Sequence, residues 1–475
     1  MFFRAETPSK PSAAALEPVL RADAGQPVSA IQQPVSAVQA DSRPPQFMQR
    51  REQRNTGRNA GIIAGLDIGS TKIACFIAEV RPDSGIVVHG IGQRAAAGIR
   101  GGEVTDMSAV CDSIGQTVEA AETMAGIGLD RVSICLGGGL PVATSRYHDI
   151  ELAGAQVTER DLQRLARADL AYYTTEGRQV LHRLPVQYKL DNNAAVRDPI
   201  GMAGRRLGMK ICVVTAEAST VQTMIAAAAQ NHLKVDKVVS AGYAACLASL
   251  KREEKELGAT VIDFGGGVTQ IAVFTDGQLS WLDAIPIGGD LVTRDIARGL
   301  GISMADAERL KTLHGSVLTA YGDSDRVLTL PVIGDNAPQQ VEMDLLGEII
   351  RPRIDEILEM LMQRMEQAGR VGYGGPSLAV GSSQQIILTG GGAQLPGMRE
   401  HVSNFFNRSA RPRIGTPLGL VGLADAANTP AFAATAGLLI ACSQPDPLAL
   451  NEGFQESSFF NLTLGRIGTW LRNNI

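Results

Sequence analysis

The sequence predicts an α/β protein built from two similar halves, each with a strand–turn–strand hairpin. Two segments far apart share one pattern: a short apolar strand with an Asp at its end, a turn of glycines and hydroxyl residues, and a second apolar strand. These segments are AGLDIGSTKIACF at 64–76 and TVIDFGGGVTQIAVF at 260–274. A third segment, IILTGGGAQLPG at 386–397, is a buried strand followed by another glycine turn.

The three turns have the composition of a phosphate-binding site. Glycines let backbone N–H groups approach phosphate oxygens closely, Ser70 and Thr71 add hydroxyl donors, and Lys72 adds a compact positive charge. Asp67 and Asp263 can hold Mg²⁺ through water, since Mg²⁺ prefers oxygen ligands and dehydrates reluctantly. Two such hairpins facing each other would clamp the phosphates of a nucleotide. Each segment alone could equally be a tight structural hairpin. The sequence has no G-x-x-x-x-G-K-[ST] motif, which excludes a P-loop protein.

The predicted elements follow in order. Apolar residues at helical spacing indicate helices at 108–125, 158–172 and 219–230, and apolar runs indicate strands at 131–136, 180–190 and 209–215. Thr158 and the acids after it are typical of a helix start. We expect a helix at 352–368 with Pro352 in its first turn, where the missing N–H costs nothing. A glycine- and serine-rich loop follows at 369–383.

At these residues the chain resembles the superfamily of actin, heat-shock chaperones and sugar kinases, and more narrowly the FtsA family. The resemblance covers about residues 61–442 and the C-terminal tip. It implies an actin-like (duplicated ribonuclease H-like) two-lobed ATPase fold with a small inserted α+β subdomain, and ATP and Mg²⁺ as cofactors. The segment 429–437 would be the second of two helices that connect the lobes.

The resemblance also assigns site residues. Asp67 and Asp263 would hold Mg²⁺ through water, and Asp263 is the candidate catalytic residue. The residues expected around the nucleotide are Gly69, Ser70, Thr71, Lys72, Gly265, Gly266, Gly267, Thr269, Gly288, Gly289, Glu308, Lys311, Gly390, Gly391 and Gly392. Glu308 and Lys311 would face ribose and adenine, although solvated helix charges are the alternative. Val268 stands where many relatives have Thr, and Thr269 could replace that hydroxyl. We therefore expect ATP binding with at most slow hydrolysis.

The domain boundaries follow from the same comparison. We expect a first lobe of residues 61–98 and 179–213, an inserted FtsA-type subdomain at 99–178, and a second lobe at 214–442. Within the second lobe, residues 303–345 would form an upper subdomain. A polar linker at 443–458 and an amphipathic helix at 459–475 would follow.

The two ends of the chain have distinct compositions. Residues 1–60 hold seven of the 22 prolines and little apolar periodicity, so we expect a disordered leader with a basic end. An organellar transit peptide is a weaker alternative. In the final helix one half of the helical wheel is apolar, which is typical of a helix lying in a membrane interface. The apolar residues are Phe459, Phe460, Leu464, Ile467, Trp470, Leu471 and Ile475. A terminal helix docked on the protein's own surface is the alternative.

Composition excludes several classes. The formal net charge is −5, with 44% hydrophobic and 20% charged residues, which argues against nucleic-acid binding. Six cysteines lie in apolar runs without C-x-x-C spacing and indicate reduced core residues of a cytosolic protein. No apolar stretch reaches the roughly 18 residues needed to span a bilayer, and the N-terminus lacks a secretory apolar region.

The resemblance implies a function in cell division. Such a protein polymerises on the inner face of the cytoplasmic membrane and anchors the tubulin-like division ring protein FtsZ, whose tail peptide docks on the upper subdomain. It also recruits later septum proteins, and it is found as a peripheral membrane protein at the division septum. The alternatives are an adaptor of pilus assembly with the same fold and a sugar-kinase-like phosphotransferase. A chaperone is less favoured, since few residues follow 442.

Overall fold

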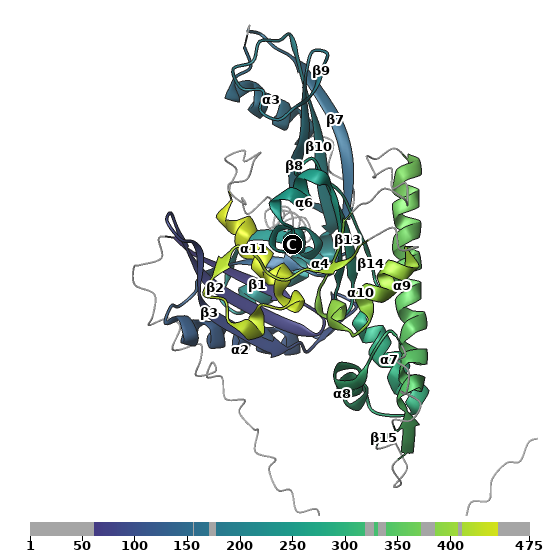
Figure 1. Cartoon of the computed structure of the whole chain (residues 1–475). Coiled ribbons are helices and arrows are strands. Elements are labelled where there is room, and N and C mark those ends of the chain that lie inside the picture. Colours follow the sequence, from purple (N-terminus) through teal and green to yellow (C-terminus); the bar gives the residue numbers. More distant parts are fainter. Residues whose placement is uncertain are drawn as a thin grey trace, which may run out of the picture. The chain divides into compact units, whose positions relative to one another are not determined.

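The computed structural model describes residues 61–154, 156–170, 177–318, 327–330, 339–371, 385–406 and 411–444 (Figure 1). The predicted leader at 1–60, nearly all of the linker at 443–458 and the membrane-targeting helix at 459–475 lie outside these residues. Parts of the upper subdomain at 303–345 and most of the predicted loop at 369–383 lie outside them as well.

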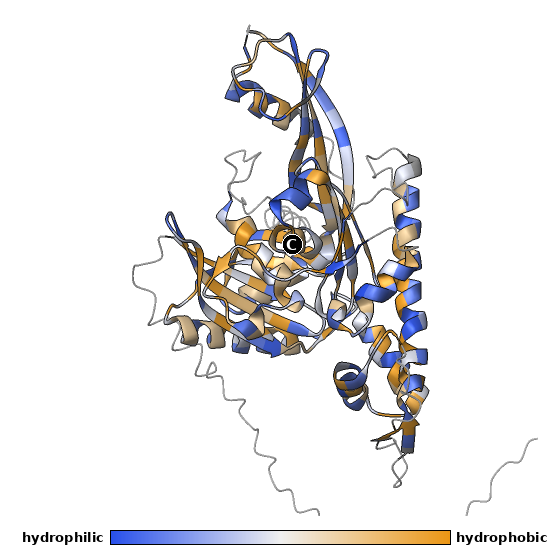
Figure 2. Cartoon of the chain, in the orientation of Figure 1, coloured by the Kyte–Doolittle hydropathy of each residue, from blue (hydrophilic) through white to orange (hydrophobic). Residues whose placement is uncertain are grey.

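The first sheet is built around the first predicted hairpin. Its order is β11-β6-β1-β2-β3-β19, with bounds Lys234–Ser240, Arg131–Leu136, Ile62–Ile68, Lys72–Arg81, Gly85–Ala95 and Leu420–Val421. Strand β2 is antiparallel to β1 on one side, and β6 is parallel to β1 on the other. Hydrophobic residues, orange in Figure 2, dominate β1, β2 and β3.

Helices cover both faces of this sheet because the side chains of β2 alternate. Ile73 and Ile77 pack with helices α2 (Met107–Ala125) and α4 (Ala218–Gln230). Phe76 points to the opposite face, where its ring stacks on Phe432 at a centroid distance of 5.8 Å. Phe432 belongs to the short helix η4 (Pro430–Phe432), which leads into α11 (Ala433–Ser443).

The second sheet repeats this arrangement. Its order is β14-β13-β12-β17-β18, with bounds Gln278–Ile285, Thr269–Thr275, Ala259–Phe264, Gln385–Thr389 and Arg413–Ile414. Strand β12 has β13 antiparallel on one side and β17 parallel on the other, as β1 has β2 and β6. The predicted duplication of the hairpin is therefore confirmed.

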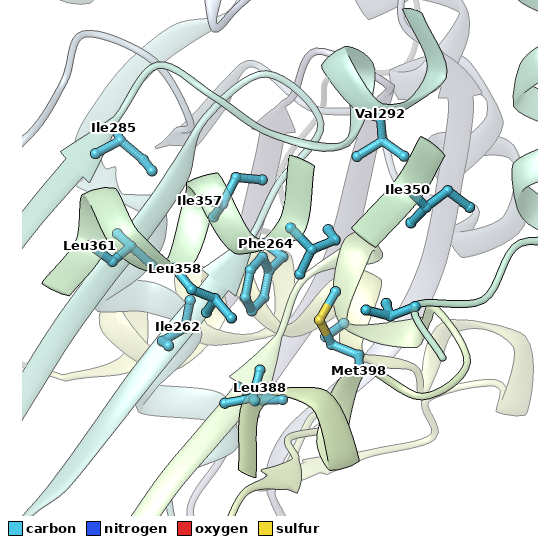
Figure 3. Close-up of a cluster of buried hydrophobic side chains, with 14 of the residues drawn as sticks. Ile262, Phe264, Ile285, Val292, Ile350, Ile357, Leu358, Leu361, Leu388 and Met398 are labelled. Atoms are coloured by element: carbon cyan, nitrogen blue, oxygen red, sulfur yellow. The ribbon is translucent and has the colours of Figure 1, made fainter. Parts of the chain in front are cut away.

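One face of the second sheet packs on the long helix α9 (Met343–Val371). Figure 3 shows Ile262 and Phe264 of β12 and Leu388 of β17 in one cluster with Ile357 and Leu358 of α9. Burying side chains of this size stabilises the fold by about 1.5–3 kcal/mol each.

Helix α9 begins at Met343, so the expectation that Pro352 opens it is wrong. Proline inside a helix costs about 3 kcal/mol because it lacks the N–H and clashes with the preceding turn. Ile350 and Ile354 on either side of Pro352 are buried in the core. Their burial offsets this cost and holds the helix continuous.

The second lobe carries two further helices and a small hairpin. Helices α7 (Gly289–Leu300) and α8 (Met304–His314) precede strands β15 (Val327–Leu330) and β16 (Gln339–Glu342), which pair antiparallel. Ser303 caps α8 by accepting a hydrogen bond from the Asp306 N–H at 3.1 Å.

The inserted subdomain has a sheet of its own in the order β7-β10-β8-β9, with bounds Val142–Glu151, Arg206–Glu217, Arg178–Leu190 and Asn193–Val196. Helix α3 (Glu159–Leu170) packs on it through Leu165 and Ala166. Strand β7 also contacts the second lobe, where the Ser145 hydroxyl donates to the Ser280 carbonyl at 3.4 Å.

Strand pairing moves both predicted boundaries of the insertion. We expected residues 99–178 to be inserted, but β6 pairs with β1 of the first sheet and α2 packs on that sheet. We expected residues 179–213 to belong to the first lobe, but β8 and β10 pair with each other and with β7. Which strands pair is decided by contacts distant in sequence, and local apolar patterns do not contain that information.

Two helices pass between the sheets. Helix α5 (Ala241–Ser249) follows β11 and packs against α11, which follows η4. A Cβ placed on Gly437 of α11 would lie 1.7 Å from the Ala244 carbonyl oxygen of α5. Only glycine permits this backbone contact.

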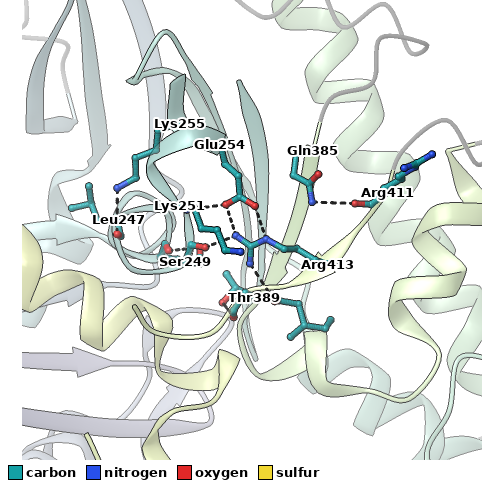
Figure 4. Close-up of polar contacts among 12 residues, drawn as sticks. Leu247, Ser249, Lys251, Glu254, Lys255, Gln385, Thr389, Arg411 and Arg413 are labelled. Carbon is teal, nitrogen blue, oxygen red and sulfur yellow. Dashed lines mark hydrogen bonds and ion pairs between the residues drawn. The ribbon is translucent and has the colours of Figure 1, made fainter. Parts of the chain in front are cut away.

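An ion pair fixes the edge of the second sheet to the turn after α5. The Arg413 guanidinium on β18 donates to Glu254 of α6 (Arg252–Leu257) at 2.7 Å and to the Ser249 carbonyl at 2.7 Å (Figure 4). Both side chains are partly buried, and the guanidinium contacts both Glu254 oxygens, which fixes the geometry of the strand edge.

The cysteines of the chain lie in or beside its hydrophobic cores. All six cysteines are free thiols, four of them buried and two partly buried, as expected for core residues. Within the described ranges, no helix is long and apolar enough to cross a bilayer.

Replacing the glycine at the helix contact tests the packing. We expect Gly437→Ala to lower the free energy of unfolding by about 2–3 kcal/mol, because α5 and α11 must separate to admit the methyl group. Urea denaturation measures this. Gly154→Ala is the control, since its Cβ would meet nothing closer than 3.9 Å. Equal stability of the two variants would contradict the contact.

Candidate functional site

The turns of the two duplicated hairpins face each other. The first turn, Gly69–Thr71, follows β1, and the second turn, Gly265–Val268, follows β12. A Cβ on Gly267 would lie 2.4 Å from the Ser70 hydroxyl oxygen, and one on Gly266 would lie 2.4 Å from the Thr71 methyl carbon. The turns therefore meet without room for side chains on the second one.

Two buried aspartates lie at the ends of the equivalent strands. Asp67 of β1 and Asp263 of β12 are 6% and 8% exposed. The Asp67 carboxylate accepts a hydrogen bond from the Thr435 hydroxyl at 2.8 Å, and its oxygen lies 3.9 Å from the Lys72 nitrogen. The described residues give the Asp263 carboxylate no such hydrogen bond.

The charges of Asp67 and Lys72 act on the carboxyl of Asp263. Burial, followed by the negative charge of Asp67, raises the pKa of Asp263 to about 7, although Lys72 opposes the change. Burial and then the charges of both aspartates raise the pKa of the Cys135 thiol on β6. Two carboxylates in one buried place favour a proton or a cation between them.

Lys72 lies on the Asp67 side of the site. Its ammonium group donates to the Ala431 carbonyl and lies 4.8 Å from the centre of the Phe432 ring. The predicted positive charge is therefore held between the first turn and the segment that leads into α11.

The third glycine turn lies against the second aspartate. Gly390 ends β17 with a φ of +81°, and its N–H donates to the Pro430 carbonyl at 3.1 Å. A Cβ on Gly390 would lie 2.3 Å from the Asp263 carboxylate, and one on Gly392 would lie 2.9 Å from Phe264. A Cβ on Gly391 would meet nothing within 4 Å. Gly390 therefore lies against Asp263, and Gly391, the next residue, faces open space.

The start of α7 packs against the second glycine turn. A Cβ on Gly288 would lie 2.4 Å from the carbonyl oxygens of Gly265 and Gly266, and the Gly289 N–H donates to the Gly265 carbonyl at 3.0 Å. Glycine is thus required where α7 begins.

Glu308 and Lys311 of α8 lie beside this helix start. The Lys311 ammonium is 2.7 Å from Glu308, 2.7 Å from the Thr293 hydroxyl and 3.2 Å from the Gly289 carbonyl. Both charges therefore adjoin the second turn through α7, and they are not isolated surface charges.

One predicted residue lies elsewhere. Thr269 is fully buried, and its hydroxyl donates to the Ile287 carbonyl at 2.7 Å. Val268 contacts the backbone at Gly102. We expected the Thr269 hydroxyl to serve the second turn, but it bonds the Ile287 carbonyl inside the fold. The side chains of residues 268 and 269 point to opposite sides at the start of β13, so Thr269 does not take the place of a hydroxyl at position 268.

Two further residues of this region were not among the predicted site residues. Asp290 follows Gly289, and its carboxylate would lie 3.1 Å from a Cβ on Gly266. Burial raises its pKa against the Lys311 charge. An Asp beside a glycine pair was a usable signal. Gln270 is buried, accepts hydrogen bonds from the Ser240 hydroxyl and the Gly242 N–H, and donates to the Gly137 carbonyl. Nothing in the sequence distinguished it from a core residue.

A metal site of protein ligands alone is not present in the described ranges: no group of three His, Cys, Asp or Glu side chains converges there. The site offers two carboxylates and bare backbone donors. Such a set suits a hydrated cation that also contacts a phosphorylated ligand.

Comparison with known families gives a consistent result. Residues 260–437 match the family model "Cell division protein FtsA", and residues 142–215 match "SHS2 domain inserted in FTSA". The second match coincides with the inserted sheet as strand pairing defines it.

Curated relatives point to the same family, and a solved structure shares the fold. The chain is 36% identical to the cell division protein FtsA of Agrobacterium fabrum over 88% of this chain and 96% of that protein. It is 31% identical to the cell division protein FtsA of Escherichia coli K12 over 80% of this chain and 89% of that protein. The structure of the PilM-PilN type IV pilus biogenesis complex matches with a TM-score of 0.56 at 16% identity, covering 82% of this chain and 100% of that chain. That likeness concerns the fold alone, and the predicted actin-like fold is confirmed.

The raised pKa of Asp263 gives the ligand-free protein a specific pH dependence. The folded carboxyl keeps its proton up to about pH 7, whereas the unfolded one loses it near 3.8. Folded stability therefore falls as pH rises between these values and then levels off. We expect Asp263→Asn to remove this fall, so that at pH 8 the variant is more stable than wild type by roughly 4 kcal/mol.

Urea denaturation at pH 5 and pH 8 measures the effect. The difference between variant and wild type should shrink at pH 5, where wild-type Asp263 is protonated. Asp112→Asn, which alters an exposed carboxylate on α2, should leave the pH dependence as it is. If Asp263→Asn and wild type lose stability in parallel, Asp263 is not the titrating group.

Proposed function

Since this chain belongs to the FtsA family of cell division proteins, we propose that it binds ATP with Mg²⁺ at the three glycine turns and polymerises on a membrane. The observation that carries the proposal is that the turns of the two duplicated hairpins face each other, with buried Asp67 and Asp263 at the ends of their first strands and the turn at Gly390 against Asp263. Duplicated turns of bare backbone facing each other suit a phosphate chain held between two lobes.

The residues present fit the nucleotide and its cation. Backbone amides of the first and second turns, with the Ser70 and Thr71 hydroxyls, would hold phosphates. Asp67 and Asp263 would hold Mg²⁺ through water, and the cation would neutralise phosphate charge. The open space at Gly391 would accommodate the adenosine, and Glu308 and Lys311, which adjoin the start of α7, would face its ribose and adenine.

We expect hydrolysis to be slow. Val268 gives the second turn no hydroxyl, and the Thr269 hydroxyl donates its hydrogen bond to the Ile287 carbonyl. Asp263 remains the candidate to orient water, but with a pKa of about 7 its carboxyl is partly protonated until a cation binds. The nucleotide would therefore act mainly as a switch for assembly.

Membrane attachment would use the predicted helix at 459–475. Its two arginines add about 1 kcal/mol each on anionic lipid, so one helix binds weakly. A polymer that carries many such helices binds firmly through avidity. We therefore propose a peripheral protein on the inner face of the cytoplasmic membrane, at the division septum.

The upper subdomain is the proposed site for FtsZ. Its helix α8 and strand β15 expose large apolar side chains, among them Leu313 at 61% and Val327 at 50%. Exposed apolar residues are typical of a site that receives a short peptide. Later septum proteins would join through surfaces that the chain does not identify.

Liposome sedimentation tests nucleotide and membrane together. Wild type with ATP and Mg²⁺ should sediment with anionic liposomes, and less should sediment with ADP or without nucleotide. Trp470→Glu should abolish sedimentation while ATP binding, followed by equilibrium dialysis, is retained, because a charge on the apolar face prevents insertion. Full liposome binding by this variant would refute the attachment helix.

The docking site is tested with a peptide of the FtsZ tail. We expect Leu313→Asp/Val327→Asp to weaken peptide binding about tenfold or more, since two apolar contacts are replaced by charges. Fluorescence anisotropy measures the affinity. Leu257→Asp changes an apolar residue that is more exposed than either, 88% on α6, and should have no effect. Equal loss in both variants would place the peptide elsewhere.

A further inference from the structure

A short hairpin reaches into the candidate site from outside the duplicated turns. Strands β4 (Ile99–Arg100) and β5 (Glu103–Val104) pair antiparallel, with Gly101 and Gly102 as their turn. A Cβ on Gly267 would lie 2.7 Å from the Gly101 Cα. A Cβ on Gly138 would lie 1.9 Å from the Gly102 carbonyl oxygen. The turn of this hairpin therefore lies between the second glycine turn and the loop after β6.

The hairpin also fixes the orientation of a proposed phosphate ligand. The Gly102 N–H donates to the Ser70 hydroxyl oxygen at 2.9 Å. A hydroxyl that accepts a hydrogen bond still has its own proton to donate. With its oxygen held by Gly102, Ser70 directs that proton elsewhere, and a phosphate oxygen is the natural acceptor.

Glu103, the next residue, links the hairpin to the inserted sheet. One carboxylate oxygen accepts the Gly139 N–H at 3.2 Å, and the other accepts the Thr220 hydroxyl at 2.7 Å. Gly139 lies just before β7, and Thr220 lies just after β10. The Gly139 carbonyl in turn accepts the Glu217 N–H at 2.9 Å. We call Gly139 and residues 217–220 the root of the insert.

From this geometry we propose that Glu103 is a positioning residue that couples the phosphate turn at Ser70 to the root of the insert. The proposal rests on the nucleotide site proposed above. Phosphate bound at Ser70 stabilises the position of the β4–β5 hairpin, and Glu103 transmits that position to both chain segments that connect the inserted sheet. Coupling is reciprocal, so loss of the contact at the root also lowers nucleotide affinity.

Hydrogen exchange on the full-length protein, with and without ATP and Mg²⁺, tests this coupling. In wild type, ATP should slow amide exchange at residues 69–72 and also at residues 217–220. In Glu103→Ala, ATP should slow exchange only at 69–72, and affinity for ATP should fall about fivefold. Glu103→Gln should restore both effects, because its amide oxygen can accept from Gly139 and its NH₂ can donate to Thr220.

Glu122→Ala is the matched control for lost stability. Glu122 is a buried carboxylate on α2 that accepts the Leu129 N–H at 2.8 Å, and it does not adjoin Gly139 or Thr220 in the contacts above. It should keep the ATP response at 217–220. Retention of that response by Glu103→Ala, or its loss by Glu122→Ala, would overturn the role of Glu103. Absence of protection at 69–72 in wild type would instead overturn the nucleotide site, and the coupling with it.

Discussion

The burial of two carboxylates in one place is the constraint on which the rest of the site depends. Asp67 has a hydroxyl and an ammonium group to stabilise its charge, whereas Asp263 has burial and a like charge against it. A protein retains such a pair only where a cation or a proton relieves it. Duplication of the sheet explains how the pair arises, since each aspartate is supplied by the same position of the same motif.

Steric fit imposes a second constraint around that pair. Gly266, Gly267, Gly288 and Gly390 each lie so close to neighbouring atoms that a methyl group would not fit. The walls of the site are consequently backbone, with amide groups as the available donors. This matches an anionic ligand better than one recognised by side chains, and it agrees with membership of a family of actin-like division proteins.

Local chemistry explains what the sequence could predict. The hairpins, the third turn and the helices α2, α3 and α4 follow from apolar periodicity and glycine placement within a dozen residues. The limits of the insert did not, because β7, β8 and β10 find their partners across long separations. Pro352 was misjudged because burial of its neighbours outweighs its local preference. Glu103 was not predicted, because a single acidic residue after a glycine pair has no pattern that distinguishes it from an ordinary surface acid.

The crossing of α5 and α11 has a mechanical consequence. At Gly437 of α11 the two backbones lie so close that not even a methyl group would fit between them. Around this contact Ala241 and Ala244 of α5 pack with Leu438 of α11. Because α5 packs on the second sheet and α11 packs on the first, this crossing joins the two lobes, and any side chain at position 437 would force the helices apart.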